Sequence, residues 1–262
     1  MMAMDSTEEM IVMPGTDSTF GWREAMAAFA IIAIVAFLVT WLVTDRGHVS
    51  RTPYIAILFL TTLILSGGYV AWSGTSVVDL VTARWGWGIV AGLLAAGLIV
   101  PLVRRRPIRP RPHGAQLTGR LIWEGVVYGT AEAVLLATLP VLAVWQATAA
   151  LGWTGTVWGR VASAMLAVLG ASFAIVVHHL GYREFRQRTA RKTLGGALVA
   201  CGTQALAFLV TGSIVAPVVA HILLHCQLTL RGDEMPPMRE IKVEIGAMRL
   251  SVEPRRKSHS RA

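Results

Sequence analysis

The stretch Glu24 to Thr44, EAMAAFAIIAIVAFLVTWLVT, is apolar over almost its whole length and carries a single charge, at Glu24. An α-helix rises about 1.5 Å per residue, so about 20 such residues cross a hydrocarbon core of about 30 Å. The stretch therefore predicts a membrane-spanning helix.

Further apolar runs of similar length follow this one. Together they predict about seven spanning helices, at roughly Glu24–Thr44, Pro53–Trp72, Trp85–Val103, Leu121–Gln146, Val161–Leu180, Leu194–Thr211 and Ile214–Leu230. Composition agrees, because 54% of the 262 residues are hydrophobic and 15% are charged, whereas a soluble domain has about 25% charged residues. The predicted fold class is all-α, a polytopic transmembrane helical bundle.

Basic residues lie in every second connection between these runs. They occur at Arg46 and Arg51, at Arg104 to Arg111, at Arg183 to Lys192, and in the tail after Leu230. Since basic loops stay on the cytoplasmic side, this pattern predicts an outer amino end, a cytoplasmic carboxyl end and a multi-pass protein of the cell membrane. The net charge of +9 is then explained by the basic loops that orient the protein in the membrane, and nucleic acid is not an expected partner.

Changes in composition divide the chain into segments. We expect a flexible lead over residues 1–22, a three-helix part over 23–103, a basic cytoplasmic linker over 104–118, a four-helix core over 119–230 and a cytoplasmic tail over 231–262. The proline- and arginine-rich run Arg104 to Gly114 looks like a hinge between two bundles, and it can also meet anionic membrane lipids. Alternation within Glu240 to Glu253 predicts a small hairpin in the tail.

Ionisable residues within the apolar runs are concentrated in the four-helix core. They are Glu124, Glu132, His178, His179, His221 and His225. An ionisable group at bilayer depth is costly and is a functional-site hypothesis by default. Residues four apart share a helix face, so His221 and His225 can point at one centre, and we expect the whole set to converge in a pocket shielded by lipid.

These residue types suit hydrolysis of a peptide bond within the membrane. A carboxylate shielded from water can act as a general base, and imidazoles can bind a metal or polarise a carbonyl group. A different interpretation remains open, because a buried His or Glu can also serve only to hydrogen-bond a neighbouring helix.

Three stretches resemble one family in the same order along the chain. TGSIVAPVVAHILLH (Thr211 to His225), SFAIVVHHLGY (Ser172 to Tyr182) and YGTAEAVLLATLP (Tyr128 to Pro140) are similar to the last, middle and first motifs of the CAAX prenyl endopeptidase and bacteriocin-processing (CPBP, or abortive-infection) family of intramembrane proteases. The resemblance covers about residues 120–237. Ala133 and Ala137 stand where the family has a second glutamate and an arginine.

The resemblance implies a role for each matching residue. Glu132 is the water-activating base, with Glu124 as the second choice, and the middle histidine is His179, with His178 as its alternative. His221 is the last motif's histidine, and His225 stands where an Asn or Asp binds the oxyanion. A divalent metal such as zinc would then have His179, His221 and His225 as ligands.

The expected substrate is a membrane-bound or lipid-modified peptide. Because the family's second glutamate and its arginine are missing, a non-catalytic member that binds or stabilises a membrane protein partner is the alternative. A third hypothesis is a haem or metal carrier, since histidines from two helices can ligate one iron. No Walker, GxGxxG or CxxC pattern supports nucleotide binding or structural zinc.

Overall fold

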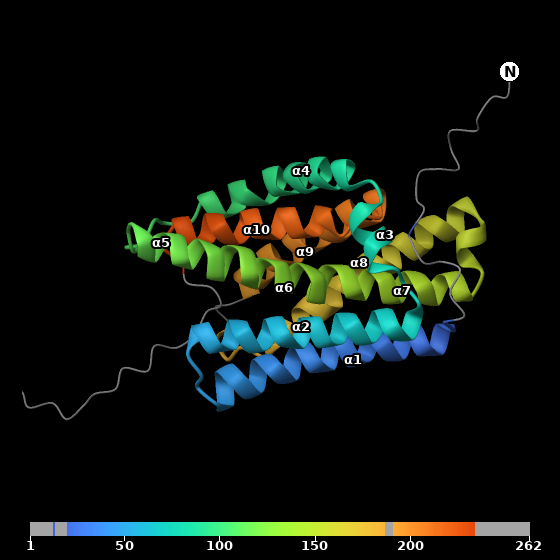
Figure 1. Ribbon diagram of the computed structural model, residues 1–262, viewed down its shortest axis with the longest axis horizontal. Helices are drawn as coiled ribbons and strands as arrows, with labels where there is room; N and C mark the ends of the chain where they lie inside the picture. Colours follow the sequence, from blue (N-terminus) through green and yellow to red (C-terminus); the bar gives the residue numbers. More distant parts are fainter. Residues whose placement is uncertain (1–12, 14–19, 187–190, 234–262) are drawn as a thin grey trace, which may run out of the picture.

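The computed structural model of the protein describes Met13, residues 20–186 and residues 191–233, and these contain helices without any strand (Figure 1). The all-α prediction is thereby confirmed. The α-helices are α1 (Trp22–Thr40), α2 (Arg51–Ser73), α3 (Val77–Thr82), α4 (Trp85–Arg104), α5 (Ala115–Arg120), α6 (Tyr128–Glu132), α7 (Leu139–Ala150), α8 (Val157–Leu180), α9 (Arg191–Thr211) and α10 (Val215–Leu230). Three π-helical segments, Trp41–Arg46, Leu121–Val127 and Ala133–Thr138, and two short 3-10 turns, Trp153–Gly155 and Glu184–Arg186, complete the order.

Six helical segments of the described chain are long and apolar enough to cross a bilayer, so the protein is a multi-pass membrane protein. They are Trp22–Arg46, Arg51–Ser73, Trp85–Arg104, Ala115–Ala150, Val157–Leu180 and Leu194–Thr211. The seventh predicted span is the 16-residue helix α10. At about 1.5 Å per residue, α10 is shorter than a full hydrocarbon core.

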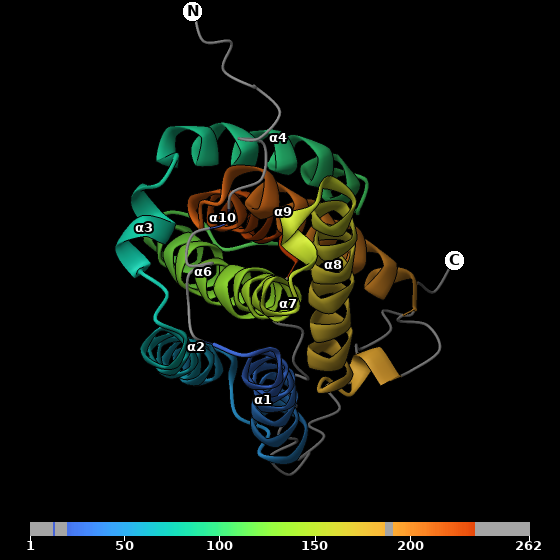
Figure 2. The same cartoon turned by 90° about the vertical axis from the view of Figure 1, so that its right-hand side faces the viewer.

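The segment Ala115–Ala150, which joins α5, α6 and α7 through two π-helical segments, is the central helix of the bundle. Of its most apolar stretch, 83% of residues are buried, against 22% to 39% in the other five spans. Figure 2 looks along α1, α2 and the central helix, with α1 and α2 on one side of the central helix and α4 and α10 on the other. The first three spans therefore flank the core on two sides, and α4 packs along α10.

Helix α10 lies inside the bundle, in contact with α4, α9 and the central helix. Glycines let two of these neighbours come close. A Cβ added at Gly92 of α4 would lie 2.7 Å from the carbonyl oxygen of Ala216, and one at Gly129 would lie 3.2 Å from Cα of Ile222. Such small residues are how membrane helices approach closely. Because α10 is covered by protein, it does not have to span the full thickness of the lipid.

Most described arginines gather at one end of the bundle, which we call the basic end. It holds the end of α1, the start of α2, the α4–α5 linker and the ends of α8 and α10, with Arg46, Arg51, Arg104, Arg105, Arg106, Arg109, Arg111, Arg120, Arg183, Arg186 and Arg231. Exposed tryptophans mark the opposite end, at Trp72, Trp85, Trp87, Trp153 and Trp158. Aromatic rings of this kind are typical of a membrane–water boundary.

The α4–α5 linker is attached to the end of α10. The backbone N–H of Arg109 donates to the carbonyl oxygen of Arg231 at 2.8 Å, and the Arg231 guanidinium donates to the carbonyl oxygen of Arg106. Asp233 lies 3.5 Å from the Arg106 guanidinium and 3.7 Å from that of Arg109. These contacts hold the linker against the basic end.

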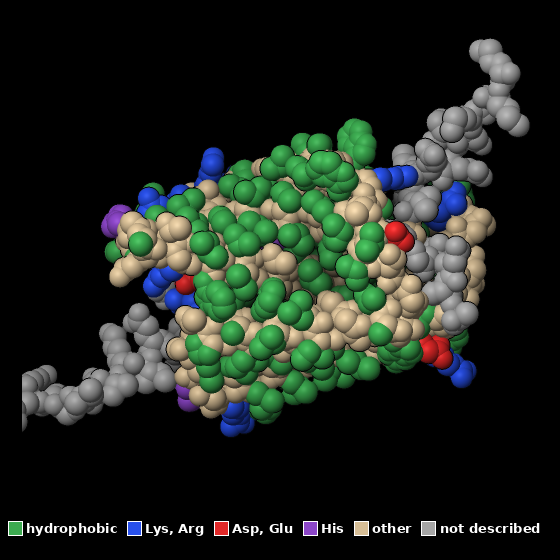
Figure 3. Space-filling view, viewed as in Figure 1, with side chains coloured by type: hydrophobic (Ala, Val, Ile, Leu, Met, Phe, Trp, Pro, Cys, Tyr) green, Lys and Arg blue, Asp and Glu red, His purple; other side chains and the backbone are tan. Residues whose placement is uncertain are grey.

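Apolar side chains cover the flank of the bundle between the basic end and the opposite, tryptophan-rich end (Figure 3). Ile64 of α2 and Leu94 and Leu98 of α4 are about two-thirds or more exposed, at 73%, 68% and 69%. A soluble protein rarely shows so many exposed large aliphatic groups together, whereas lipid is a good solvent for them. The flank is therefore the surface that meets the acyl chains.

Several predictions fall on residues outside the described part of the chain. They are the lead over 1–22, apart from Met13 and residues 20–22, the hairpin within Glu240 to Glu253, and the tail beyond Asp233. These remain predictions from the sequence.

Candidate active site and metal centre

Glu132 is the last residue of α6 and lies near the middle of the central helix. A π-helical segment precedes α6 and another follows it. π-helical turns are rare and occur frequently at functional sites, because the extra residue per turn changes which side chains face inward. The Glu132 side chain is 4% exposed, so its carboxylate is removed from bulk water.

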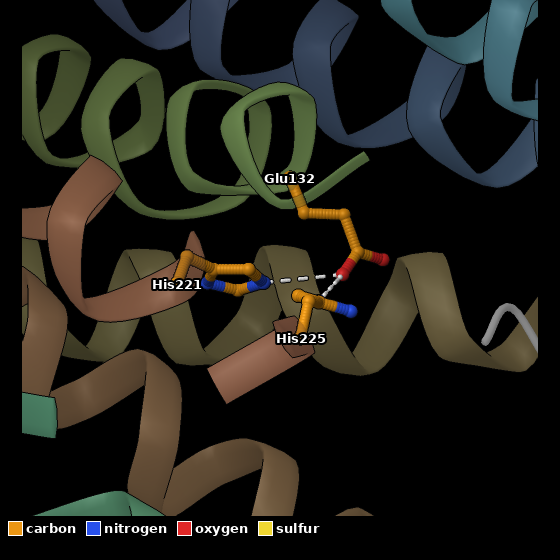
Figure 4. Close-up of side chains that lie close together, drawn as sticks. All are labelled: Glu132, His221 and His225. Carbon is orange, nitrogen blue, oxygen red and sulfur yellow. Dashed lines mark hydrogen bonds and ion pairs between the residues drawn. The ribbon is translucent and has the colours of Figure 1, made fainter. Parts of the chain in front are cut away.

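Two imidazoles of α10 meet one oxygen of this carboxylate. Nε2 of His221 lies 3.1 Å from Oε2 of Glu132, and Nε2 of His225 lies 2.9 Å from the same oxygen (Figure 4). The two rings stack with their centroids 4.8 Å apart, as residues four apart on one helix face allow. We call Glu132, His221 and His225 the Glu132 cluster. The structure thus brings together residues of the fourth and seventh predicted spans.

His178, at the end of α8, contacts the other oxygen of the carboxylate. Its Nε2 lies 3.2 Å from Oε1 of Glu132. The neighbouring His179 points elsewhere, with its Nδ1 2.9 Å from the carbonyl oxygen of Ile175 and its side chain in a cavity wall. The sequence interpretation preferred His179 as the middle histidine, but it is the alternative, His178, that the structure places against Glu132.

Three further polar residues, which the sequence did not single out as site residues, complete the surroundings. The Tyr128 hydroxyl donates to Oε1 of Glu132 at 2.5 Å and contacts the Tyr182 hydroxyl at 3.0 Å. Burial raises the pKa of the Tyr182 phenol well above its ordinary value, so this hydroxyl stays protonated. Gln204 of α9 lies 2.6 Å from Nδ1 of His221.

Two of these residues left a signal in the sequence. Tyr128 is four residues before Glu132 on the same helix, and Gln204 is an amide within an apolar span. A polar group at that depth is a candidate for a shared hydrogen-bond network.

Hydrogen-bond partners assign the tautomers of two histidines. Carbonyl oxygens only accept, so Nδ1 of His178, 3.3 Å from the Ala36 carbonyl, and Nδ1 of His179 each carry a hydrogen. The Gln204 amide lies 2.6 Å from Nδ1 of His221 and can turn either its oxygen or its nitrogen to the ring, so this contact does not assign the tautomer of His221. In their neutral forms His178 and His179 then present the Nε2 lone pair.

The Nε2 lone pair of neutral His178 therefore faces Oε1 of Glu132, whereas Nε2 of His221 and Nε2 of His225 lie at hydrogen-bonding distance from Oε2. A lone pair facing a carboxylate repels it unless a proton or a metal cation lies between them. Histidines that ligate metals donate their other ring N–H to a carbonyl or carboxylate oxygen, and His178 has that arrangement. His225 differs, because its buried Nδ1 has no hydrogen-bond partner among the described residues.

The Glu132 cluster can hold a metal ion. Glu132, His221 and His225 each offer one ligand atom, and these atoms lie within 4.8 Å of one another. Two histidines and one carboxylate form a recurrent ligand set of catalytic zinc sites. The predicted ligand set of His179, His221 and His225 differs from this group at one member, since Glu132 takes the place of His179.

A cavity of about 890 Å³ extends from the Glu132 cluster to the basic end. Glu132, His179, His221 and His225 form its polar inner part, and Arg106, Arg109, Glu184 and Asp233 line it near the basic end. The remaining walls are mostly apolar and include Ile99, Leu102, Val103, Ile175, Phe185, Val199, Leu224 and Leu228. Such a cavity suits an apolar chain with a polar group placed at the cluster.

Glu124, the second-choice base, does not join the cluster. It lies two turns earlier on the central helix, where its Oε1 is 3.8 Å from the Arg51 guanidinium and 3.9 Å from that of Arg120. Those contacts make it part of an ionic group at the basic end. It does not line the cavity.

Compared with known protein families, with curated proteins and with solved structures, the chain matches none of them.

Proposed function

We propose that this protein is an intramembrane endopeptidase that hydrolyses a membrane-bound or lipid-modified peptide, with Glu132 as the general base. The observation that carries the proposal is the buried Glu132 carboxylate, held by His221 and His225 at the inner part of an apolar cavity that reaches the basic end. The resemblance of three sequence motifs to the CPBP proteases supports the same function.

Glu132 lines the cavity, so a water there can meet its carboxylate. Oε1 accepts the Tyr128 hydroxyl, while Oε2 faces the two imidazoles of α10. A water beside Oε2 gives its proton to Glu132 as its oxygen attacks the carbonyl carbon of the substrate. Glu132 then returns the proton to the leaving nitrogen, the C–N bond breaks, and a carboxylic acid and an amine result.

The residues present also fit a divalent metal such as zinc, which His221 and His225 would hold with Oε2 of Glu132. When bound, the metal would polarise the scissile carbonyl group and make its bound water more acidic. In that form Oε2 is a ligand, so the ligand and base roles of this oxygen are alternatives. Chelation tests the metal: activity that falls with a chelator and returns with zinc requires a bound metal, whereas activity that persists with a chelator leaves Oε2 free to act as the base.

The test compares Glu132→Gln with Glu124→Gln, a matched change of a second buried carboxylate on the same central helix. Each variant replaces the wild-type protein in its host, and mass spectrometry follows the ends of membrane peptides. We expect uncleaved substrates to accumulate with Glu132→Gln and not with Glu124→Gln. The opposite pattern would make Glu124 the base.

A metal-binding membrane protein without hydrolytic activity is the second candidate function. The Glu132 cluster favours it, because its three possible ligand atoms lie within 4.8 Å of one another. Stoichiometric metal in the purified protein, together with unchanged peptides in the Glu132→Gln strain, would establish this candidate. A Soret band would identify haem as the bound group.

A further inference from the structure

Six buried side chains form a closed loop of polar contacts at Oε1 of Glu132, which we call the hydroxyl loop. Its members are Thr40 of α1, Tyr54 of α2, Tyr128 and Glu132 of α6, His178 of α8, and Tyr182, which follows α8. Each member is at most 4% exposed.

The contacts of the hydroxyl loop are 2.5 to 3.2 Å long. Tyr54 lies 3.0 Å from Thr40 and 2.8 Å from Tyr182, and Tyr182 lies 3.0 Å from Tyr128. Tyr128 donates to Oε1 of Glu132 at 2.5 Å. His178 closes the loop, with Nε2 3.2 Å from that oxygen and Nδ1 3.1 Å from the Thr40 hydroxyl.

The hydrogen bonds of the loop run in one direction. An ionised carboxylate only accepts, so Tyr128 donates its proton to Glu132 and its own oxygen accepts from Tyr182. Tyr182 in turn accepts from Tyr54, and Tyr54 accepts from Thr40. Every hydroxyl thus donates once and accepts once, and all of them point toward Oε1. A chain of this kind is strengthened by mutual polarisation and by the charge at its end.

We infer that the hydroxyl loop positions Glu132, holding Oε1 so that Oε2 stays turned toward His221, His225 and the cavity. The catalytic consequence rests on the function proposed above, whereas the coupling of the loop to Glu132 follows from the geometry alone. Its members Thr40 and Tyr54 act through other residues, because neither touches the carboxylate. Helices α1 and α2 thereby help to build a site whose reacting groups all lie on α6 and α10.

The first test is a double-mutant cycle on unfolding in mixed detergent micelles. We expect Tyr54→Phe to lower the denaturation midpoint of the wild-type protein and to lower it much less in a Glu132→Leu background, although the two side chains share no hydrogen bond. Tyr69→Phe is the matched control: Tyr69 is also buried on α2 and hydrogen-bonded, but its partner is Gln146.

The control should shift the midpoint equally in both backgrounds. Equal shifts for Tyr54→Phe as well would overturn the inference. If Glu132→Leu does not fold, Tyr128→Phe replaces it, because this change removes the last hydroxyl of the chain and keeps the aromatic ring.

The second test measures hydrolysis of a cleaved peptide in proteoliposomes. We expect Tyr182→Phe to lower kcat about 10-fold, as loss of an outer hydrogen bond to a reacting group does, with KM unchanged. Tyr69→Phe should leave both constants unchanged. If the unfolding cycle shows that Tyr54 is coupled to Glu132 but Tyr182→Phe leaves kcat unchanged, the hydroxyl loop has a purely structural role. If the wild-type protein is no more active than Glu132→Gln, the proposed function is refuted. The unfolding cycle still decides whether the hydroxyl loop is coupled to Glu132, because it does not depend on activity.

Discussion

Two buried polar clusters each include residues of α2 and the central helix, and they differ in charge. The Gln146 cluster joins Tyr69, Ser73, Thr75 and Gln146, all of them neutral, and lies near the tryptophan-rich end. The Glu132 cluster with its hydroxyl loop contains a carboxylate and three imidazoles and borders a cavity. Both are nearly free of solvent contact.

The difference shows what separates polar groups that stabilise a membrane bundle from those suited to chemistry. In the Gln146 cluster, the amide nitrogen of Gln146 donates to Thr75 at 2.9 Å and its oxygen accepts from Tyr69. Donors and acceptors match there without any added ion. At Glu132, three imidazole nitrogens lie within 3.2 Å of the two carboxylate oxygens, and Glu132, His221 and His225 can together hold a metal ion.

The largest expected effect in this comparison concerns metal binding by a histidine of the Glu132 cluster. His221→Ala removes a ligand atom, and we expect zinc affinity to fall by more than about 100-fold, the upper end of the cost of losing an outer hydrogen bond. Isothermal titration of the detergent-purified protein measures it. His179→Ala is the control and should keep most of the affinity, because His179 is not part of the group. A stronger loss from His179→Ala would restore the ligand set expected from the sequence.

An intermediate effect is expected from Gln204→Leu. This change removes the amide that contacts Nδ1 of His221 and leaves every ligand atom in place. Zinc affinity should fall about 10-fold, since the ring loses the hydrogen bond that orients it. Isothermal titration with zinc measures this effect, as for His221→Ala. An unchanged zinc affinity would mean that packing alone orients the His221 ring.

The smallest effect is expected in the Gln146 cluster. Gln146→Leu breaks hydrogen bonds to Tyr69 and Thr75, and the free energy of unfolding should fall by about 1 kcal/mol, in the range measured for hydrogen bonds between membrane helices. Zinc affinity and peptide hydrolysis should not change. Loss of either property in a stably folded variant would show that the two clusters are coupled along the central helix.

Much of the fold could be predicted from the sequence, because the length and polarity of a run are local properties. Each predicted span corresponds to a helix, with α10 as a short one. Part of the site was also predictable: Glu132, His221 and His225 stand out as ionisable groups within apolar runs, and the four-residue spacing of the histidines places both on one face.

Other parts of the site could not be predicted from spacing. His178 and His179 are adjacent and lie about 100° apart on the helix. The choice between them depends on α1, whose Ala36 carbonyl and Thr40 hydroxyl contact the ring of His178. Thr40 and Tyr54 come from spans with no ionisable residue at depth, so nothing in the sequence marks them. The family resemblance and the orientation of the termini stay predictions.

The sequence by itself determined that this is a helical membrane protein, because lipid forces every backbone polar group in a spanning segment into a helix and the apolar runs are long enough to be read one at a time. It also determined which residues are costly enough at that depth to suggest a function. Only the tertiary structure decided which of them meet, since contacts between spans depend on the rotation and close approach of helices. Small residues such as Gly92 and Gly129 allow that approach, and the hydroxyl loop then turns Glu132 toward α10.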